Sequence, residues 1–116
     1  MPTIWHNPRC SKSRQTLQLL QERGLEPTVR RYLEDSPAAM EIEEVLRMLG
    51  LEPRQLMRRR EAPFAELALK DPSHDRAALV QAMADHPVLI ERPVVIHDGK
   101  AALGRPPDAV LSLFDR

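Results

Sequence analysis

The chain has 116 residues, with 17 basic and 17 acidic side chains and no formal net charge. A chain of this length is expected to form one domain with its own hydrophobic core. The balance of charge argues against a general nucleic-acid-binding or membrane-surface role, and an aromatic content of 3% argues against a base-stacking platform.

The first predicted elements form a β-α-β unit. Residues 3–6 are β-prone and stop at Asn7-Pro8, and residues 10–23 are predicted to form a helix that ends before Gly24. Residues 28–33 are expected to form a second strand. Because a helix connects the two strands, we expect them to be parallel.

The middle of the chain is predicted to be helical. Ser36-Pro37 opens a helix in which apolar residues recur at i, i+3, i+4 and i+7. Shorter helices are expected to start at Pro53 and Pro63. Ser73 is the expected N-cap of a further helix that runs to Asp85.

The last part of the chain is predicted to be a hairpin followed by a helix. Residues 93–97 form the first strand, Asp98-Gly99 is a strong two-residue turn signal, and residues 100–103 form the return strand. Pro106-Pro107 opens the last helix. The apolar residues of this helix that we expect to face the core are Val110, Leu111 and Phe114.

The order of these elements predicts the fold class. It is β-α-β, then several helices, then β-β-α, which matches an α/β protein with a thioredoxin-like four-stranded mixed sheet. A helical insertion at approximately residues 37–88 separates the two halves. The whole chain, residues 1–116, is expected to be a single domain of this kind.

Cys10, the only cysteine, is expected between the first strand and the first helix. Near a helix N-cap, unsatisfied N–H groups and the helix dipole stabilise a thiolate. The first acidic residue is Glu22, so the surroundings are basic. We expect a reactive thiol of lowered pKa, tuned by positive charge on His6, by the Ser13 hydroxyl and by Arg14. An inert buried thiol is the alternative, and the polar turn disfavours it.

Two other cysteine chemistries are excluded. A phosphatase loop of the form Cys-x5-Arg requires arginine at the position of Thr16, and a Cys-x-x-Cys dithiol requires cysteine at the position of Ser13. Because the chain cannot form an internal disulfide, any redox cycle needs an external thiol. The four histidines show no metal-ligand spacing, so no metal site is expected.

Residues 5–14, Trp-His-Asn-Pro-Arg-Cys-Ser-Lys-Ser-Arg, resemble the opening of the ArsC-type arsenate reductases. These are glutaredoxin-coupled enzymes of thioredoxin-like fold. The match continues over essentially the whole chain. The downstream segments that carry it are Leu56-Met57-Arg58, Glu91-Arg92-Pro93-Val94-Val95 and Gly104-Arg105-Pro106.

The resemblance implies a role for individual residues. Cys10 resembles the nucleophile that attacks arsenate, His6 and Ser13 resemble residues that depress its pKa, and Pro93 resembles the cis-proline that faces it. Three arginines resemble those that hold the oxyanion, and planar guanidinium forks suit that task. They are Arg58, Arg92 and Arg105.

The resemblance also implies the co-substrate and the partner. Arsenate would be reduced to arsenite through a covalent thioarsenate on Cys10, with glutathione as co-substrate, glutaredoxin as partner and no bound cofactor or metal. The chain opens with no signal-peptide pattern and contains no apolar stretch of about 20 residues, so we expect a cytoplasmic protein without a membrane span.

Two alternatives stay open. Spx-type regulators, which bind RNA polymerase, resemble this chain in architecture, but their sensor is usually a Cys-x-x-Cys pair and Ser13 argues against it. A related thiol-dependent oxidoreductase with a different oxidised or anionic substrate is the other alternative, and the sequence separates it poorly from an arsenate reductase.

Overall fold

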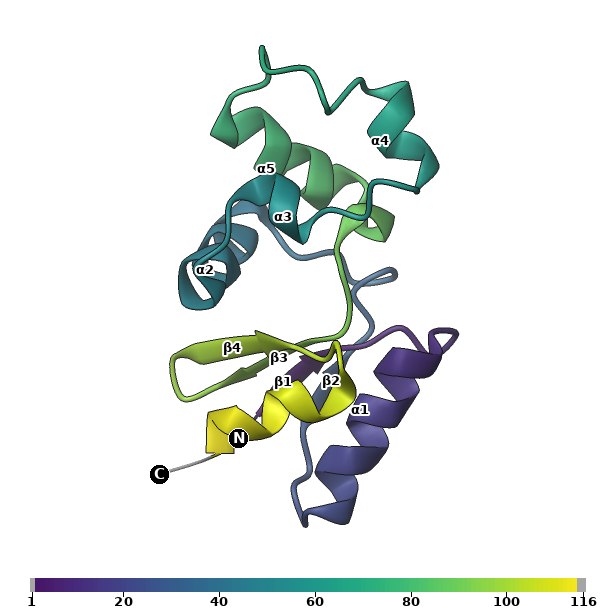
Figure 1. Ribbon diagram of the computed structural model, residues 1–116, viewed down its shortest axis with the longest axis vertical. Coiled ribbons are helices and arrows are strands. Elements are labelled where there is room, and N and C mark those ends of the chain that lie inside the picture. The colour runs from purple at the N-terminus through teal and green to yellow at the C-terminus, as the bar shows by residue number, and fades with distance from the viewer. Residues whose placement is uncertain (1, 115–116) are drawn as a thin grey trace. The chain divides into compact units, whose positions relative to one another are not determined.

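The computed structural model describes residues 2–114 and divides the chain into two compact units (Figure 1). The sheet unit is built from both ends of the chain, up to Asp35 and from Arg92 onward. The helical unit is continuous and comprises Ser36–Glu91.

The sheet unit contains one four-stranded sheet and two helices. Its strands lie in the order β2-β1-β3-β4, in which β1 and β2 are parallel and the other two pairs are antiparallel. Its elements are β1 (Thr3–Trp5), α1 (Ser11–Glu22), β2 (Thr28–Arg30), β3 (Val94–His97), β4 (Lys100–Leu103) and the 3-10 helix η2 (Pro107–Phe114).

One face of the sheet carries the core of this unit. Ile4 of β1 lies directly opposite Val95 of β3 in the antiparallel register, so both side chains point to the same face. Leu20 of α1 and Val110 of η2 pack against them, and all four side chains are fully buried. Both helices therefore cover the same face of the sheet.

The predicted thioredoxin-like mixed sheet with a helical insertion is confirmed. The hairpin strand Lys100–Leu103 lies where it was predicted, because Asp98-Gly99 makes the turn between β3 and β4. The second strand ends earlier than predicted, at Arg30. The chain turns there, since the carbonyl of Arg31 accepts hydrogen bonds from the backbone N–H groups of Glu34 and Asp35.

The last helix differs in detail from its prediction. Residues Pro107–Phe114 form a 3-10 helix, in which side chains three apart eclipse one another. Val110 is buried as predicted, whereas Leu111 and Phe114 are only partly buried.

The helical unit contains four α-helices and one 3-10 helix among its described residues. Its core is built mainly by α2, through Ile42, Val45 and Leu46, and by α5, through Leu79, Val80 and Met83. The elements are α2 (Ala39–Leu49), α3 (Pro53–Leu56), α4 (Ala62–Glu66), α5 (Arg76–Asp85) and η1 (Pro87–Leu89).

The N-cap predicted for α5 is wrong by two residues. Asp75, not Ser73, is the N-cap, and the Asp75 carboxylate accepts a hydrogen bond of 2.8 Å from the backbone N–H of Ala78. Ser73 instead lies in the preceding turn, where its N–H donates to the Asp71 carboxylate. Both residue types cap helices well, so the local sequence alone did not separate them.

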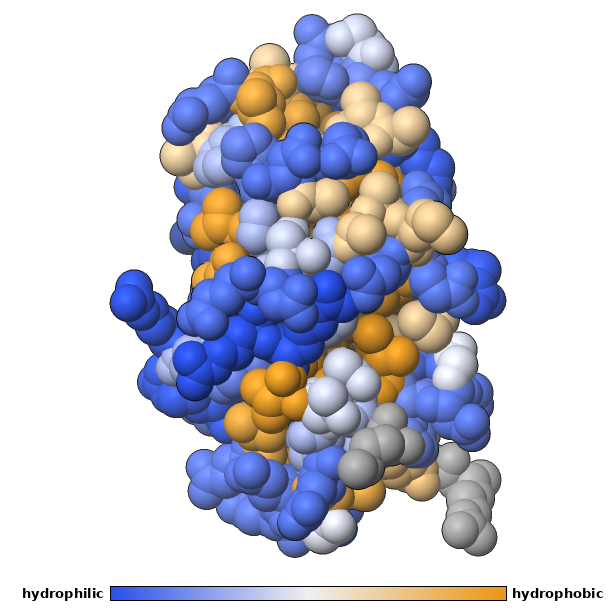
Figure 2. All heavy atoms as spheres, turned by 180° about the vertical axis from the view of Figure 1, so that it is seen from behind, coloured by the Kyte–Doolittle hydropathy of each residue, from blue (hydrophilic) through white to orange (hydrophobic). Residues whose placement is uncertain are grey.

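The surface is mixed in polarity. On the face drawn in Figure 2, hydrophilic side chains are interspersed with smaller hydrophobic areas. None of the helices among residues 2–114 combines the length and the apolar character needed to cross a membrane.

Candidate thiol site

Cys10 is the N-cap residue of α1 and is buried, with 8% of the residue exposed. Its N–H donates to the carbonyl of Asn7 at 3.0 Å, and its carbonyl accepts from the N–H of Arg14. The first turn of α1 carries Lys12 and Arg14 but no acidic residue. Because cations at a helix N-terminus are unfavourable by about 0.3–1 kcal/mol each, this turn is electrostatically suited to an anion.

The backbone of α1 does not cap the sulfur. Within the part of the chain that the structure describes, the Cys10 side chain accepts no hydrogen bond from the N–H groups of the first turn. The N–H groups that we expected to stabilise a thiolate at the N-cap therefore make no hydrogen bond to the sulfur in this arrangement. The contribution of the helix to a thiolate is that of its dipole and its cations.

His6 and Ser13 form a buried polar pair beside the Cys10 loop. The His6 Nδ1 and the Ser13 Oγ share a hydrogen bond of 2.6 Å, and the N–H of Asn7 donates to the same Ser13 oxygen at 3.1 Å. Burial, followed by the positive charges of Arg31 and Arg14, lowers the pKa of His6 from its ordinary value of 6.5. This shift favours the neutral ring, contrary to the expectation that His6 adds positive charge next to Cys10.

Arg14 holds the loop that carries the cysteine. Its guanidinium donates to the carbonyl of Pro8 at 2.9 Å, across the turn between β1 and α1. This bond ties the first turn of α1 to the loop, so Arg14 fixes the position of Cys10 as well as its electrostatic surroundings.

The structure brings Arg105 and Arg92 to the thiol loop from the other end of the chain. The Arg105 Nε donates to the carbonyl of Arg92 at 2.8 Å, and an Arg105 terminal nitrogen lies 4.0 Å from the Cys10 sulfur. The Arg92 backbone thereby orients the Arg105 guanidinium toward the cysteine. Arg105 is an exposed residue and Arg92 is partly buried.

Pro93 lies at a tight junction between β3, β4 and α1. The Arg92–Pro93 peptide bond, for which the resemblance implies a cis form, is cis, and so is Arg105–Pro106. The N–H of Gly104 donates to the carbonyl of Pro93 at 2.9 Å. A Cβ at Gly104 would overlap the Thr16 hydroxyl and would lie 2.6 Å from the Pro93 Cγ, so only glycine fits.

The structure also separates Arg58 from the arginines that follow it. Arg58 lies in the helical unit, is partly buried, and forms an ion pair of 2.8 Å with Glu61. Arg59 and Arg60 are exposed, and Arg59 lies over the ring of Phe64. Of the three neighbours, Arg58 is the one whose side chain is held in place by acidic groups.

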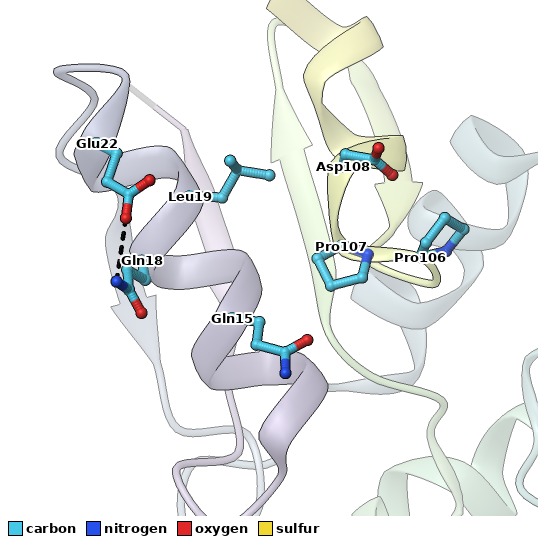
Figure 3. Close-up of a pocket in the computed structure, with 7 residues that line it drawn as sticks. All are labelled: Gln15, Gln18, Leu19, Glu22, Pro106, Pro107 and Asp108. Carbon is cyan, nitrogen blue, oxygen red and sulfur yellow. Dashed lines mark hydrogen bonds between the residues drawn. The ribbon is translucent and has the colours of Figure 1, made fainter.

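A groove of about 400 Å³ lies elsewhere in the sheet unit, between α1 and the start of η2 (Figure 3). Leu19 points toward η2 in this view, and Gln18 and Glu22 are hydrogen-bonded to each other. The groove carries the carboxylates of Glu22 and Asp108 and no cationic side chain in its lining. It therefore does not suit an oxyanion.

Metal ligands do not cluster in the described residues. Across residues 2–114, no three or more His, Cys, Asp or Glu side chains are placed to hold a metal ion.

Sequence reasoning missed two contributions to these sites. Arg31 acts electrostatically on His6 because the parallel pairing of β1 and β2 brings the ends of both strands to one edge, where the N–H of His6 donates to the carbonyl of Arg30. The predicted parallel pairing of the two strands already implied that residues at their ends lie close together. Glu61 and Glu91 approach Arg58, and only the i,i+3 spacing of Glu61 was visible in the sequence.

Comparisons with known proteins match almost the whole chain. The family model described as "ArsC family" matches residues 5–113. The chain is 51% identical over 111 residues to the uncharacterised protein YfgD of Escherichia coli K12, covering 95% of this chain and 93% of that protein. It is 49% identical over 104 residues to an arsenate reductase of Neisseria meningitidis serogroup A, covering 89% of each chain.

A solved structure shows the same fold. The arsenate reductase from Vibrio cholerae superposes with a TM-score of 0.94 at 49% sequence identity, covering 97% of this chain and 96% of that chain.

Proposed function

Because the chain belongs to the ArsC family, we propose that it reduces arsenate to arsenite with electrons from external thiols. Glutathione is the proposed co-substrate and glutaredoxin the proposed partner protein, and the chain itself needs no cofactor. The names of the relatives from Neisseria meningitidis and Vibrio cholerae support the reaction. The single cysteine supports the need for an external thiol, because the chain has no second cysteine to resolve an oxidised Cys10.

In the proposed reaction the Cys10 thiolate attacks arsenic and expels one arsenate oxygen as water or hydroxide. Glutathione then attacks arsenic and expels a second oxygen as water. The glutaredoxin thiolate takes the glutathione sulfur as a mixed disulfide, and the electron pair of the broken As–S bond stays on arsenic. Two thiols, those of glutathione and glutaredoxin, thus lose the two electrons that reduce As(V) to As(III). Water then replaces the Cys10 sulfur on arsenic, which releases arsenite and regenerates the Cys10 thiolate.

The roles of the arginines follow from charge. A thiolate and an oxyanion repel each other, so fixed guanidinium groups are needed to bring them together. We assign this role to Arg58, Arg92 and Arg105. His6, Ser13 and Arg14 are proposed to hold the Cys10 loop and to favour the thiolate, with His6 acting as a neutral hydrogen-bonding partner of Ser13.

One observation carries the proposal for this chain. The terminal nitrogen of Arg105 lies 4.0 Å from the Cys10 sulfur, while the Nε of the same guanidinium is anchored to the carbonyl of Arg92. A thiol next to an anchored guanidinium, at the cation-rich start of a helix, is suited to attack on an oxyanion. An inert core cysteine has no need of such neighbours.

Coupled turnover tests the proposal. Oxidation of NADPH is followed with the purified protein, arsenate, glutathione, glutaredoxin and glutathione reductase, and the Cys10→Ser variant is the control. We expect arsenate-dependent turnover that the variant lacks. Turnover that is equal in both proteins, or absent in a folded wild-type protein with an alkylatable Cys10, rejects arsenate as the substrate.

The same preparation tests the Spx-type alternative. Retention of the RNA polymerase α-subunit by the folded protein, in the absence of arsenate turnover, would favour the regulator. Turnover with another oxidised or anionic substrate, again dependent on Cys10, would favour the related oxidoreductase.

A further inference from the structure

Two carboxylates of the helical unit lie near Arg58, one of the arginines that we propose bind the oxyanion. A Glu61 carboxylate oxygen forms an ion pair of 2.8 Å with a terminal nitrogen of the Arg58 guanidinium, and a Glu91 oxygen lies 4.0 Å from the Arg58 Nε. The three side chains are only 24–27% exposed. Because burial reduces screening, these charges act on one another more strongly than surface ion pairs do.

A backbone turn holds Glu61 close to Arg58 independently of the ion pair between their side chains. Its N–H donates to the carbonyl of Arg58 at 3.2 Å, so the two residues are joined through a backbone turn before their side chains meet. A pair held by such a turn loses little conformational freedom when it forms. The acid is thus kept close to the guanidinium whether or not an oxyanion is present.

The Glu61 carboxylate does not cap the helix that follows it. Glu61 is the N-cap residue of α4, yet within residues 2–114 its side chain accepts no capping hydrogen bond. The residues that normally cap a helix with their side chains are the shorter Ser, Thr, Asp and Asn. Its orientation toward Arg58 is therefore a feature of this site and not a by-product of helix capping.

We infer that Glu61 is a specificity-determining residue that competes with the oxyanion for the guanidinium of Arg58. The inference rests on the proposed function, since it assigns Arg58 to oxyanion binding. Because Glu61 stays close to Arg58, its negative charge opposes the attraction of the guanidinium for an anion. This repulsion grows with the charge of the anion. Glu61 thus lowers affinity for all anions, and most for the more highly charged ones.

The test replaces the acid by its neutral isostere and separates KM from kcat. We expect Glu61→Gln to lower the KM for arsenate about two- to fivefold with kcat nearly unchanged, which is the range of a partly exposed ion pair. Glu44→Gln is the matched control, because Glu44 also pairs with an arginine three residues away in the same unit. That control should leave KM unchanged.

A binding measurement makes the test independent of turnover. Sulfate and nitrate are used as probes that slow alkylation of Cys10. In Glu61→Gln both anions should protect Cys10 at lower concentrations than in the wild-type protein, and the gain should be larger for sulfate, which carries two charges. In an Arg58→Gln background, Glu61→Gln should have no further effect, since its target is gone. If Glu61→Gln has the same effect in the Arg58→Gln background as in the wild-type protein, the inference is overturned.

The outcomes separate the inference from the proposed function. A raised or unchanged KM in Glu61→Gln, with wild-type turnover intact, rejects competition and leaves arsenate reduction standing. If the wild-type protein does not reduce arsenate, the proposed function fails. The inference is then decided only by how well sulfate protects Cys10 from alkylation in the two proteins. Equal protection of wild type and Glu61→Gln overturns it.

Discussion

At the scale of single residues, His6 shows how burial changes the chemistry that a sequence motif suggests. The ring lies at the end of β1, 6% exposed, and is hydrogen-bonded to Ser13. Two arginine charges and desolvation disfavour its protonated form. Its contribution to the thiol loop is therefore geometric, because it fixes the Ser13 hydroxyl and with it the start of α1.

The lowered pKa of His6 predicts a pH dependence of stability. In the unfolded chain His6 binds a proton as the pH falls through about 6.5, whereas the folded protein binds it only at lower pH. The unfolded state then holds more protons, so the free energy of unfolding falls as pH falls through this window. Urea denaturation at about pH 7.5 and about pH 5.5 measures the loss, which should be smaller in His6→Gln. An equal loss in both proteins would contradict the assignment.

The candidate site could be predicted in part from the sequence. The place of Cys10 before a helix and the basic character of the loop follow from local order and composition. The uncharged state of His6 does not, because it depends on burial and on Arg31, which reaches the site only through pairing of β1 with β2. The anchoring of Arg105 by the Arg92 carbonyl depends likewise on the antiparallel hairpin.

At the scale of elements, Gly104 sets the distance between α1 and the end of the hairpin. Gly104→Ala should destabilise the protein by about 1–3 kcal/mol, because the new methyl group overlaps the rigid Pro93 ring and the buried Thr16 side chain. Urea denaturation measures this. In a Thr16→Ala background, Gly104→Ala should lower the free energy of unfolding by less than it does in the wild-type protein, because the Thr16 hydroxyl is gone. No coupling between the two positions would show that crowding is not the cause.

The start of α5 gives a second prediction at this scale. Asp75→Ala should lower the free energy of unfolding by about 0.5–2 kcal/mol, because the N–H of Ala78 loses its acceptor. Ser73→Ala is the matched control and should change stability by less than about 0.5 kcal/mol, as expected for a surface substitution away from a cap. Denaturant midpoints of the two variants decide between the caps. Equal losses would restore Ser73 as a capping residue.

The elements were predicted most accurately where one local signal dominates. The Asp98-Gly99 turn located both hairpin strands, and Gly50, left-handed at φ 68°, ends α2. The short β2 and the 3-10 geometry of η2 were not predictable in this way. The first depends on a turn closed by Arg31, and the second on how the helix packs against the core around Val110.

At the scale of the whole molecule, one cysteine limits what oxidation can produce. Incubation with oxidised glutathione should give a mixed disulfide with one glutathione per chain, detected by intact-mass spectrometry and absent in Cys10→Ser. A disulfide between two chains requires the sulfurs of two Cys10 residues, each only 8% exposed, to come within bonding distance, so it should form slowly. A covalent dimer as the main product would contradict this prediction.

The strand order has a consequence for how the protein is made on the ribosome. The central pair of the sheet joins β1 to β3, and the whole helical unit is synthesised between these two strands. Until then β1 and β2 lack the partner that completes their sheet, whereas Ser36–Glu91 is already continuous and available to collapse. We therefore expect the nascent chain to acquire helical structure first, and the thiol loop to mature only after β3 and Arg105 have been synthesised.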